Sequence, residues 1–411
     1  MGNTSGRAGG GEHRHAVRRV TVIGTGLIGT SIALALRARD VDVTLSDPDP
    51  SSLRLACDLG AGRPLDESAD PSAAPADVAV VAAPPAVVPA VLRRAQDRGL
   101  AHVYTDVASV KASVLAEAER LGCDMATFVP GHPMGGREKQ GPGAARADLF
   151  LGRSWALCPT GKADPETVAA VAEVARLCGA DPLVLDAGVH DRAVALVSHA
   201  PHVAASAVAA RLVSGDAAAL TLAGQGVRDV TRVAGGDPAM WTEILTHNAA
   251  PVADVLYAVA ADLAATADAL RGAAEEAGTG GSDANTAVAG GAAPVPGTEG
   301  AGRPPVGAEV LAPVRDLLER GRAGHGRIPG KHGTVRLPEY TVIPVVIPDE
   351  PGTLGRLFAS AAAAGVNIED VRIEHTPGLP LGVAQLHVLP EAVDAFVRAL
   401  AADGWSVHPG A

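Results

Sequence analysis

The sequence predicts three consecutive folds: an α/β domain with a doubly wound parallel sheet, an all-α domain, and a small α+β unit. Apolar strands alternate with helical segments over residues 18–185, which is typical of a parallel sheet with crossover helices. From Val189 to about Arg271 only helical periodicity is present. From Tyr340 to Val407 the expected order is β-α-β-β-α-β, which is the ferredoxin-like unit.

The first strand leads into a glycine-rich turn. Apolar residues 20–23 are followed by three glycines in the spacing G-x-G-x-x-G. Gly24 permits the tight strand-to-helix turn, Gly26 lets a pyrophosphate approach the backbone, and Gly29 lets the next helix pack closely. Phosphates would meet free N–H groups at the positive end of that helix, so we expect a dinucleotide site of the Rossmann type. The expected cofactor contacts at this turn are Gly24, Gly26, Leu27, Ile28 and Gly29.

The second strand, residues 41–45, ends in Ser46-Asp47. An acid at this distance from the glycines can accept hydrogen bonds from both ribose hydroxyls. Its charge would repel a 2′-phosphate, so NAD is favoured over NADP. An ordinary glycine turn with a solvated aspartate is the alternative. Ala83 and Pro84, at the end of the strand over residues 78–83, are further expected cofactor contacts.

The remaining strands of this domain are short and apolar. We expect them at residues 103–105 and 128–129, with helices over 86–97 and 113–121. The segments at 155–158 and 182–185 are expected to be the final strands of the same sheet.

Two polar motifs follow strand ends, where ligands bind in open α/β sheets. They are TDVASVK at residues 105–111 and GHPMGGREK at residues 131–139. His132 is a candidate general base because its pKa lies near working pH. Ser109 is placed to orient that imidazole or to touch a nicotinamide ring. A histidine held by its loop, without catalytic work, is the alternative.

The helical domain carries further candidates. His190 is followed by His199 and His202, which are three residues apart and therefore neighbours on one helix face. A carboxylate or third ligand at helix spacing is missing, so no metal site is expected. Arg232 offers a planar fork that matches a carboxylate, although a lone arginine is often a surface ion pair.

Composition and the remaining segments limit the function classes. The net charge of −12 argues against a nucleic-acid partner. The four cysteines are scattered, which favours neither zinc nor disulfides. Residues 1–17 are expected to be a loose tail without a signal peptide, and residues 272–306 a flexible insertion. No continuous apolar run is long enough to span a bilayer, so a cytoplasmic protein without a membrane partner is expected.

Taken together, the motifs resemble a known family. The set TDVASVK, GHPMGGREK, SHAPH, RDVTR and DPAMW, behind the glycine turn, is similar to the prephenate and arogenate dehydrogenases of tyrosine biosynthesis over residues 18–335. The stretch Asp349 to Leu354, DEPGTL, resembles the amino-acid-sensing ACT domain. The chain departs from the family at Gly135, where alanine is common, and in its long spacer. Neither departure touches the candidate chemistry.

The resemblance implies NAD-dependent oxidative decarboxylation of a cyclohexadienol. His132 would accept the hydroxyl proton, and Arg232 would hold a substrate carboxylate. His202 and His190 would line the same pocket. Glu138 would gate or order the loop after His132. Trp241 is either a pocket wall or a packing residue at a hinge.

The preferred substrate is prephenate, with arogenate as the near alternative. A non-catalytic sensor of NAD and an amino acid is expected to lack the general base or the residue that holds the substrate carboxylate. His132 and Arg232 are both present, which argues against such a sensor. A 6-phosphogluconate-type dehydrogenase would need a lysine base, but residues 189–271 contain no lysine. Tyrosine is the expected effector of the unit at 338–411, although a degenerate dimerisation module remains open. The Ala-rich helical domain, residues 186–335, predicts a homodimer.

Overall fold

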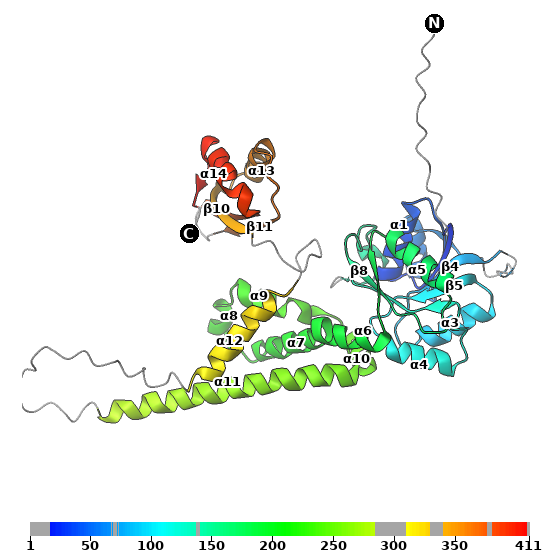
Figure 1. Ribbon diagram of the computed structural model, residues 1–411, viewed down its shortest axis with the longest axis horizontal. Helices are drawn as coiled ribbons and strands as arrows, with labels where there is room; N and C mark the ends of the chain where they lie inside the picture. The colour runs from blue at the N-terminus through cyan, green and yellow to red at the C-terminus, as the bar shows by residue number, and fades with distance from the viewer. Residues whose placement is uncertain are drawn as a thin grey trace, which may run out of the picture. The chain divides into compact units, whose positions relative to one another are not determined.

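The computed structural model describes residues 17–66, 68, 72, 74–136, 140–283, 310–328, 340–375 and 380–408 (Figure 1). Contacts divide the chain into two units, residues 1–311 and residues 312–411. The predicted domain boundaries at 185 and 335 are finer than this division and stay predictions. The predicted tail, apart from Val17, lies outside the described residues.

The first unit is built on a six-stranded sheet with the order β3-β2-β1-β4-β5-β6, and all its pairings are parallel. This confirms the predicted doubly wound sheet. Helices pack on it through two clusters of buried aliphatic side chains, which include Ile32, Leu36 and Leu92. The strands are β1 (Arg19–Ile23), β2 (Asp42–Ser46), β3 (Arg63–Pro64), β4 (Ala76–Val81), β5 (Ala101–Asp106) and β6 (Phe128–Val129). The helices are α1 (Leu27–Arg37), α2 (Pro50–Asp58), α3 (Val88–Asp97), α4 (Ala112–Arg120) and α5 (Pro165–Leu177).

A separate three-stranded sheet corrects one prediction. The segments expected as final strands of the parallel sheet form β8 (Ser154–Leu157) and β9 (Asp181–Val184), joined by β7 (Gly131–Pro133) in the order β7-β8-β9. β7 pairs antiparallel with β8. The reason lies at Gly131, whose N–H and C=O are bonded by the side chains of Asp106 and Lys111. Those groups are therefore not available to extend the ladder beside β5, and the chain leaves the large sheet there.

Residues 187–271 of the first unit are mostly helical, as predicted. The helices are α6 (Ala187–Val194), α7 (Ala200–Leu212), α8 (Ala217–Thr221), α9 (Gln225–Thr231), α10 (Pro238–His247) and α11 (Ala249–Asp283). A π-helical turn, η3 (Ala195–His199), joins α6 to α7, and a 3-10 turn, η4 (Arg232–Gly235), follows α9.

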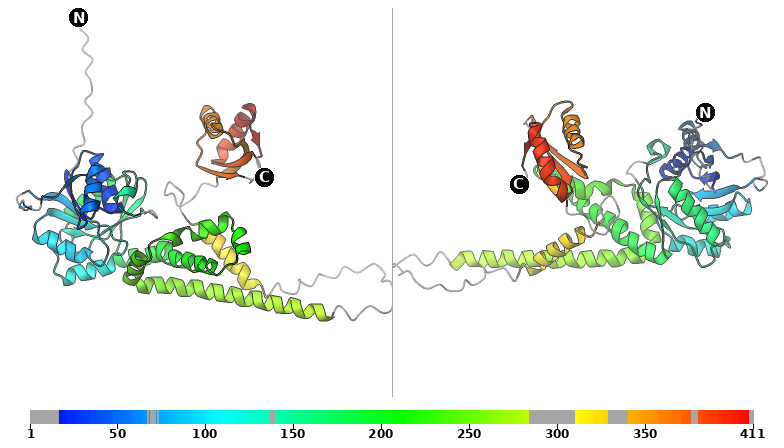
Figure 2. Two further views of the ribbon diagram at one scale, coloured as in Figure 1. Left: turned by 180° about the vertical axis from the view of Figure 1, so that it is seen from behind. Right: turned by 45° about the horizontal axis from the view of Figure 1, so that its top comes forward.

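Helix α11 is longer than predicted (Figure 2). It covers residues 272–283, which were expected to belong to the flexible insertion. The alanines and glutamates at 273–277 are strong helix formers and continue the preceding periodicity, which explains the difference. Residues 284–306 lie outside the described part of the chain.

Two helical stretches are long and apolar enough, by length and composition alone, to cross a membrane: residues 187–212 and 249–275. Neither stretch is a continuous apolar run, because charged residues interrupt both, so neither was predicted from the sequence. Helix α11 buries very little of its surface, and Tyr257, Leu263 and Leu270 are all exposed. Such an apolar face on a lone chain calls for a partner surface.

The second unit contains helix α12 (Ala312–His325) and a four-stranded sheet with the order β11-β12-β10-β13. The sheet is antiparallel throughout. Its elements follow the predicted order: β10 (Thr341–Pro348), α13 (Thr353–Ala363), β11 (Asp370–His375), β12 (Leu381–Val388), α14 (Val393–Ala402) and β13 (Ser406–Val407). Ile343, Leu357 and Phe396 are fully buried between the sheet and the two helices. The predicted hairpin at Pro377-Gly378 lies outside the described residues.

Candidate active site

The glycine turn between β1 and α1 has one open position. Gly24 has φ +105°, and a Cβ there would lie 2.1 Å from the carbonyl oxygen of Ala82. A Cβ at Gly29 would lie 2.0 Å from the carbonyl oxygen of Gly24. At Gly26 a Cβ would meet nothing within 4 Å. Gly24 and Gly29 are therefore required by packing, while the backbone at Gly26 faces free space at the start of α1. This space fits a pyrophosphate at a helix N-terminus.

Asp47 lies beside this turn, directly after β2. Its Oδ2 accepts hydrogen bonds from the Thr25 backbone N–H at 2.5 Å and from Thr25 Oγ1 at 2.9 Å. Its Oδ1 accepts the N–H of Asp49 at 2.8 Å. These contacts hold the carboxylate at the edge of the dinucleotide turn, where a ribose would lie.

A buried ion pair joins the two polar motifs. Lys111 Nζ lies 2.6 Å from Asp106 Oδ2, and neither side chain is exposed. Lys111 Nζ also donates to the carbonyl oxygen of Gly131 at 2.6 Å. The loop after β5 and the strand that carries His132 are therefore fixed against each other. Sequence reasoning quoted both residues but gave neither a role, although an acid and a base at the two ends of a loop are a signal for such a pair.

His132 lies on β7 rather than in a loop. Its Nδ1 is 2.9 Å from Nε2 of His190, and the two rings meet edge to face with centroids 5.1 Å apart. Burial holds the pKa of His132 well below its usual range, and the neighbouring His190, Lys111 and His199 lower it further. The imidazole is therefore neutral near pH 7, which is the form that can accept a proton.

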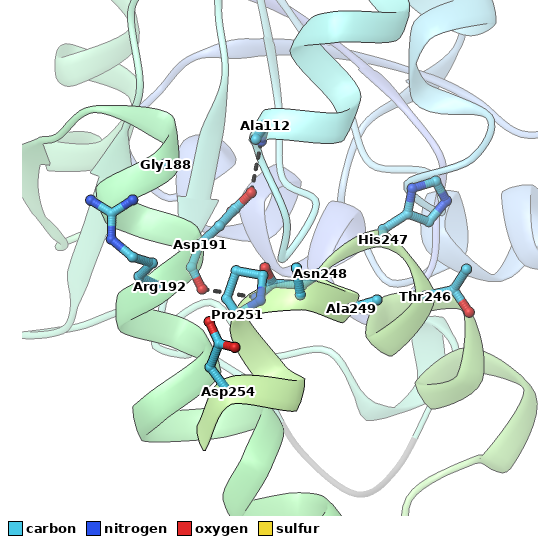
Figure 3. Close-up of a pocket in the computed structure, with 11 residues that line it drawn as sticks. Ala112, Gly188, Asp191, Arg192, Thr246, His247, Asn248, Ala249, Pro251 and Asp254 are labelled. Carbon is cyan, nitrogen blue, oxygen red and sulfur yellow. Dashed lines mark hydrogen bonds between the residues drawn. The ribbon is translucent and has the colours of Figure 1, made fainter. Parts of the chain in front are cut away.

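His190 belongs to α6 and is buried. Its Nδ1 lies 2.8 Å from Asp191 Oδ1. Asp191 also accepts the N–H groups of Lys111 at 2.9 Å and Ala112 at 2.8 Å, so it caps helix α4 (Figure 3). Burial raises the pKa of Asp191, but the hydrogen bonds from His190 and the two amides outweigh it and leave the pKa below its ordinary value. The carboxylate is ionised.

A second pair of histidines lies next to this group. Asn248 Nδ2 donates to the Asp191 carbonyl oxygen at 2.8 Å and contacts His199 Nδ1 at 3.0 Å. Burial lowers the pKa of His199 to about 4. His202, on α7, stacks on Trp241 of α10 with ring centroids 3.6 Å apart, and His199 meets the same indole edge to face. Burial also lowers the pKa of His202.

Three further predicted site residues are Ser109, Arg232 and Glu138. Ser109 is half-buried in the loop between β5 and α4. Arg232 is exposed at the start of η4, which packs on α7. The chain after η4 reaches Gly236, where a Cβ would lie 2.5 Å from Trp241 Nε1 and 3.1 Å from a ring carbon of His202. Glu138 lies outside the described residues.

A pocket of about 460 Å³ is lined by Asp191 and by neighbouring residues of the helical region (Figure 3). It is bounded by the start of α4, by α6 and by the junction of α10 and α11. Figure 3 shows Asp191 pointing from α6 toward the Ala112 N–H, with Arg192 and Asp254 at the rim. His132 and the glycine turn are not among the residues that line it.

Comparison with known proteins assigns both halves of the first unit. Residues 32–184 match the prephenate dehydrogenase nucleotide-binding domain, and residues 186–278 match the prephenate dehydrogenase dimerization domain. The chain belongs to the prephenate dehydrogenase family. It is 38% identical over 393 residues to the Streptomyces niveus protein named "Probable prephenate dehydrogenase NovF", covering 95% of this chain and 100% of that protein.

Two solved structures in the prephenate dehydrogenase group are also similar. Prephenate dehydrogenase from Aquifex aeolicus, in complex with hydroxyphenyl propionate and NAD⁺, has a TM-score of 0.57 and 26% identity, covering 64% of this chain and 94% of that one. Arogenate dehydrogenase from Synechocystis has a TM-score of 0.51 and 28% identity, covering 60% and 89%. As a member of the prephenate dehydrogenase family, the chain is an NAD-dependent oxidoreductase. The predictions of an enzyme and of NAD are therefore confirmed.

Within this dehydrogenase, one continuous line of contacts includes four of the predicted site residues: His132, His190, His202 and Trp241. His132 contacts His190, whose neighbour Asp191 is bonded through its carbonyl oxygen to Asn248. His199, Trp241 and His202 follow in turn. Asp191 and Asn248 were missed by sequence reasoning. Asp191 had a signal, since an acid directly after a candidate histidine can fix its ring, whereas Asn248 lies 57 residues further along and had none.

Proposed function

We propose that this dehydrogenase converts prephenate into 4-hydroxyphenylpyruvate and CO₂, with reduction of NAD⁺, in tyrosine biosynthesis. The observation that carries the proposal is the neutral, hydrogen-bonded His132 at the carboxyl edge of the NAD-binding sheet. An imidazole in this state can take the proton of a ring hydroxyl. The match to prephenate dehydrogenases supports the substrate class.

The step balances without a further reactant. The hydroxyl O–H bond breaks and its proton goes to His132, while the C–H electron pair on the same carbon leaves as hydride. NAD⁺, when bound, supplies the hydride acceptor. The bond to the ring carboxylate then breaks, CO₂ leaves, and its electron pair completes the aromatic ring. The phenolate oxygen takes the proton back from His132. Aromatisation supplies the driving force, so the residues here need to position groups and hold one proton.

Substrate choice is tested by a side-by-side NADH assay with prephenate and arogenate. Prephenate is expected to give the higher kcat/KM. A clear preference for arogenate would support the alternative enzyme, which forms tyrosine directly. Absence of turnover with both would favour a non-catalytic sensor and would overturn the proposed activity.

We expect Asp47 to set the preference for NAD over NADP. The anchored carboxylate offers acceptors to the ribose hydroxyls and repels a 2′-phosphate. Replacing Asp47 by serine should raise KM for NAD. The ratio of KM for NADP to KM for NAD should fall by about tenfold or more, because a charged hydrogen bond is lost. Steady-state kinetics with both cofactors measure this. A wild-type enzyme with a lower KM for NADP than for NAD would contradict the assignment.

We propose that Arg232 binds a substrate carboxylate, with His202 and Trp241 as walls of the same site. Gly236 brings the segment that follows Arg232 against the His202–Trp241 stack, which supports the placement. Arg232→Lys removes the paired geometry and should raise KM for prephenate about tenfold with a smaller change in kcat. Arg228→Lys, four residues earlier on α9, is the matched control. An unchanged KM in Arg232→Lys would remove this role.

We propose that the unit at 338–411 is a ferredoxin-like ACT domain that binds tyrosine near Asp349 to Gly352 and Asn367. The β-α-β-β-α-β order and the antiparallel sheet support this fold. Tyrosine should inhibit the full chain, and deletion of residues 338–411 should abolish the inhibition. Equal inhibition before and after the deletion would show that tyrosine acts elsewhere.

We further propose a cytoplasmic homodimer formed through the helical region. The dimerization-domain match and the exposed apolar face of α11 support a second copy as the partner. Burying that face against an identical helix would also account for the apolar stretches at 187–212 and 249–275 without a membrane. Light scattering of the full chain should give twice the mass of one chain. A monomeric mass would contradict the proposal.

A further inference from the structure

Three side chains form a hydrogen-bonded line that ends at the proposed base. Asp191 Oδ1 lies 2.8 Å from His190 Nδ1, and His190 Nε2 lies 2.9 Å from His132 Nδ1. Asp191 and His190 are both almost fully buried, at 4% and 1% exposure. Solvent is therefore poorly placed to replace either contact.

The chemistry of each group gives the line a direction. Asp191 is ionised and can only accept, so His190 Nδ1 donates to it. With Nδ1–H directed at Asp191, His190 offers the lone pair of Nε2 to His132, and this atom accepts from Nδ1–H of His132. The proton of neutral His132 is thereby placed on Nδ1. Its Nε2 is left with the lone pair that a general base needs.

We propose that His190 and Asp191 are positioning residues that hold His132 in the tautomer whose Nε2 accepts the substrate proton. The inference rests on the proposed function of His132 and reassigns His190 from a substrate contact to a support of the base. In the other tautomer, Nε2–H would point at the substrate hydroxyl and could not accept from it. After proton transfer, the Asp191 carboxylate also stabilises the positive charge on the two imidazoles until the proton returns to the ring oxygen.

Two substitutions at His190 separate the parts of this role. Glutamine places an amide oxygen where Nε2 stood, so it can still accept from His132 Nδ1–H but cannot be protonated. Phenylalanine keeps the volume and removes the acceptor. We expect His190→Phe to lower kcat by about 100-fold, the low end of the contribution of a general base, with little change in KM. His190→Gln should retain most of the activity.

The tautomer itself gives a readout that does not depend on turnover. In the ¹⁵N-histidine-labelled full chain, His132 is assigned by the signals lost in His132→Asn. Near pH 7 the wild type and His190→Gln should show protonated Nδ1 at His132, and His190→Phe should lose this preference. Asp191→Asn should also weaken it, but that change disturbs the cap of α4. Asp186→Asn is the matched control, because it alters the side-chain cap of α6 at Gly188 and Val189 and keeps the backbone bond from the His190 N–H to the Asp186 carbonyl oxygen.

Each outcome decides the inference. Protonated Nε2 at His132 in the wild type, or a wild-type kcat in His190→Phe, would overturn it. Equal losses of kcat in His190→Gln and His190→Phe would also overturn it, because the hydrogen-bond acceptor for His132 Nδ1–H would then make no difference to catalysis. A wild-type enzyme inactive with both substrates would refute the proposed function, while the tautomer measurement would still decide the role of His190 and Asp191.

Discussion

Replacing His132 by asparagine is expected to lower kcat by about 10²–10⁴-fold, the usual contribution of a positioned general base. The asparagine amide can still donate to His190 from a place near the former Nδ1, so the surrounding contacts are kept. KM for prephenate should change little because the imidazole acts on the proton in the transition state. Stopped-flow and steady-state NADH formation measure both constants.

The control for this variant is His102→Asn, which changes an exposed histidine on β5. NAD binding, followed by fluorescence titration, should be the same in both variants and in the wild type. If His132→Asn turns over at the wild-type rate, another group takes the hydroxyl proton. A loss of NAD binding in parallel with kcat would instead place His132 at the cofactor.

Replacing Lys111 by methionine is expected to cost about 3–5 kcal/mol of unfolding free energy, because it leaves the buried Asp106 carboxylate without its counter-charge. The same change removes the donor to the Gly131 carbonyl oxygen, so the strand that carries His132 should loosen as well. Urea unfolding of the full chain measures the first effect. The fall in kcat of the still-folded fraction measures the second.

Lys162→Met provides the matched comparison. Its partner Glu119 lies at 3.1 Å, but both side chains are well exposed, and such a pair contributes about 0–1 kcal/mol. The double variant Asp106→Asn with Lys111→Met should recover part of the lost stability, because no buried charge is then left alone. Similar losses of unfolding free energy in Lys111→Met and Lys162→Met would show that the buried ion pair contributes no more to stability than the exposed one.

Local signals in the sequence were sufficient to predict the glycine turn and NAD as the cofactor. A side chain at Gly29 would collide with Gly24 in the same strand-turn-helix unit, and one at Gly24 would collide with Ala82 at the end of the neighbouring strand β4. The position of Asp47 beside the turn was also predictable, since it directly follows the neighbouring parallel strand, while its contact with the cofactor stays a prediction. The element order of the C-terminal unit was also predictable, because strand and helix periodicities differ clearly over short segments.

Features that depend on distant pairing were not predictable. The strands β8 and β9 have the apolar character of sheet strands, but nothing local shows that Gly131 is bonded by Asp106 and Lys111 and turned out of the main sheet. The roles of Asp191 and Asn248 likewise depend on contacts across long stretches of chain. A candidate list drawn from residue type favours histidines and arginines and overlooks the carboxylate that orients them.

The carboxylate of Asp191 has two roles: it accepts hydrogen bonds from the backbone N–H groups at the start of α4, and it accepts one from the ring of His190. Fraying of the N-terminal end of α4 would therefore stop turnover while most of the molecule stayed folded. On gentle heating, activity should fade before the cooperative melt, and ligands that tighten the start of α4 should delay that fading.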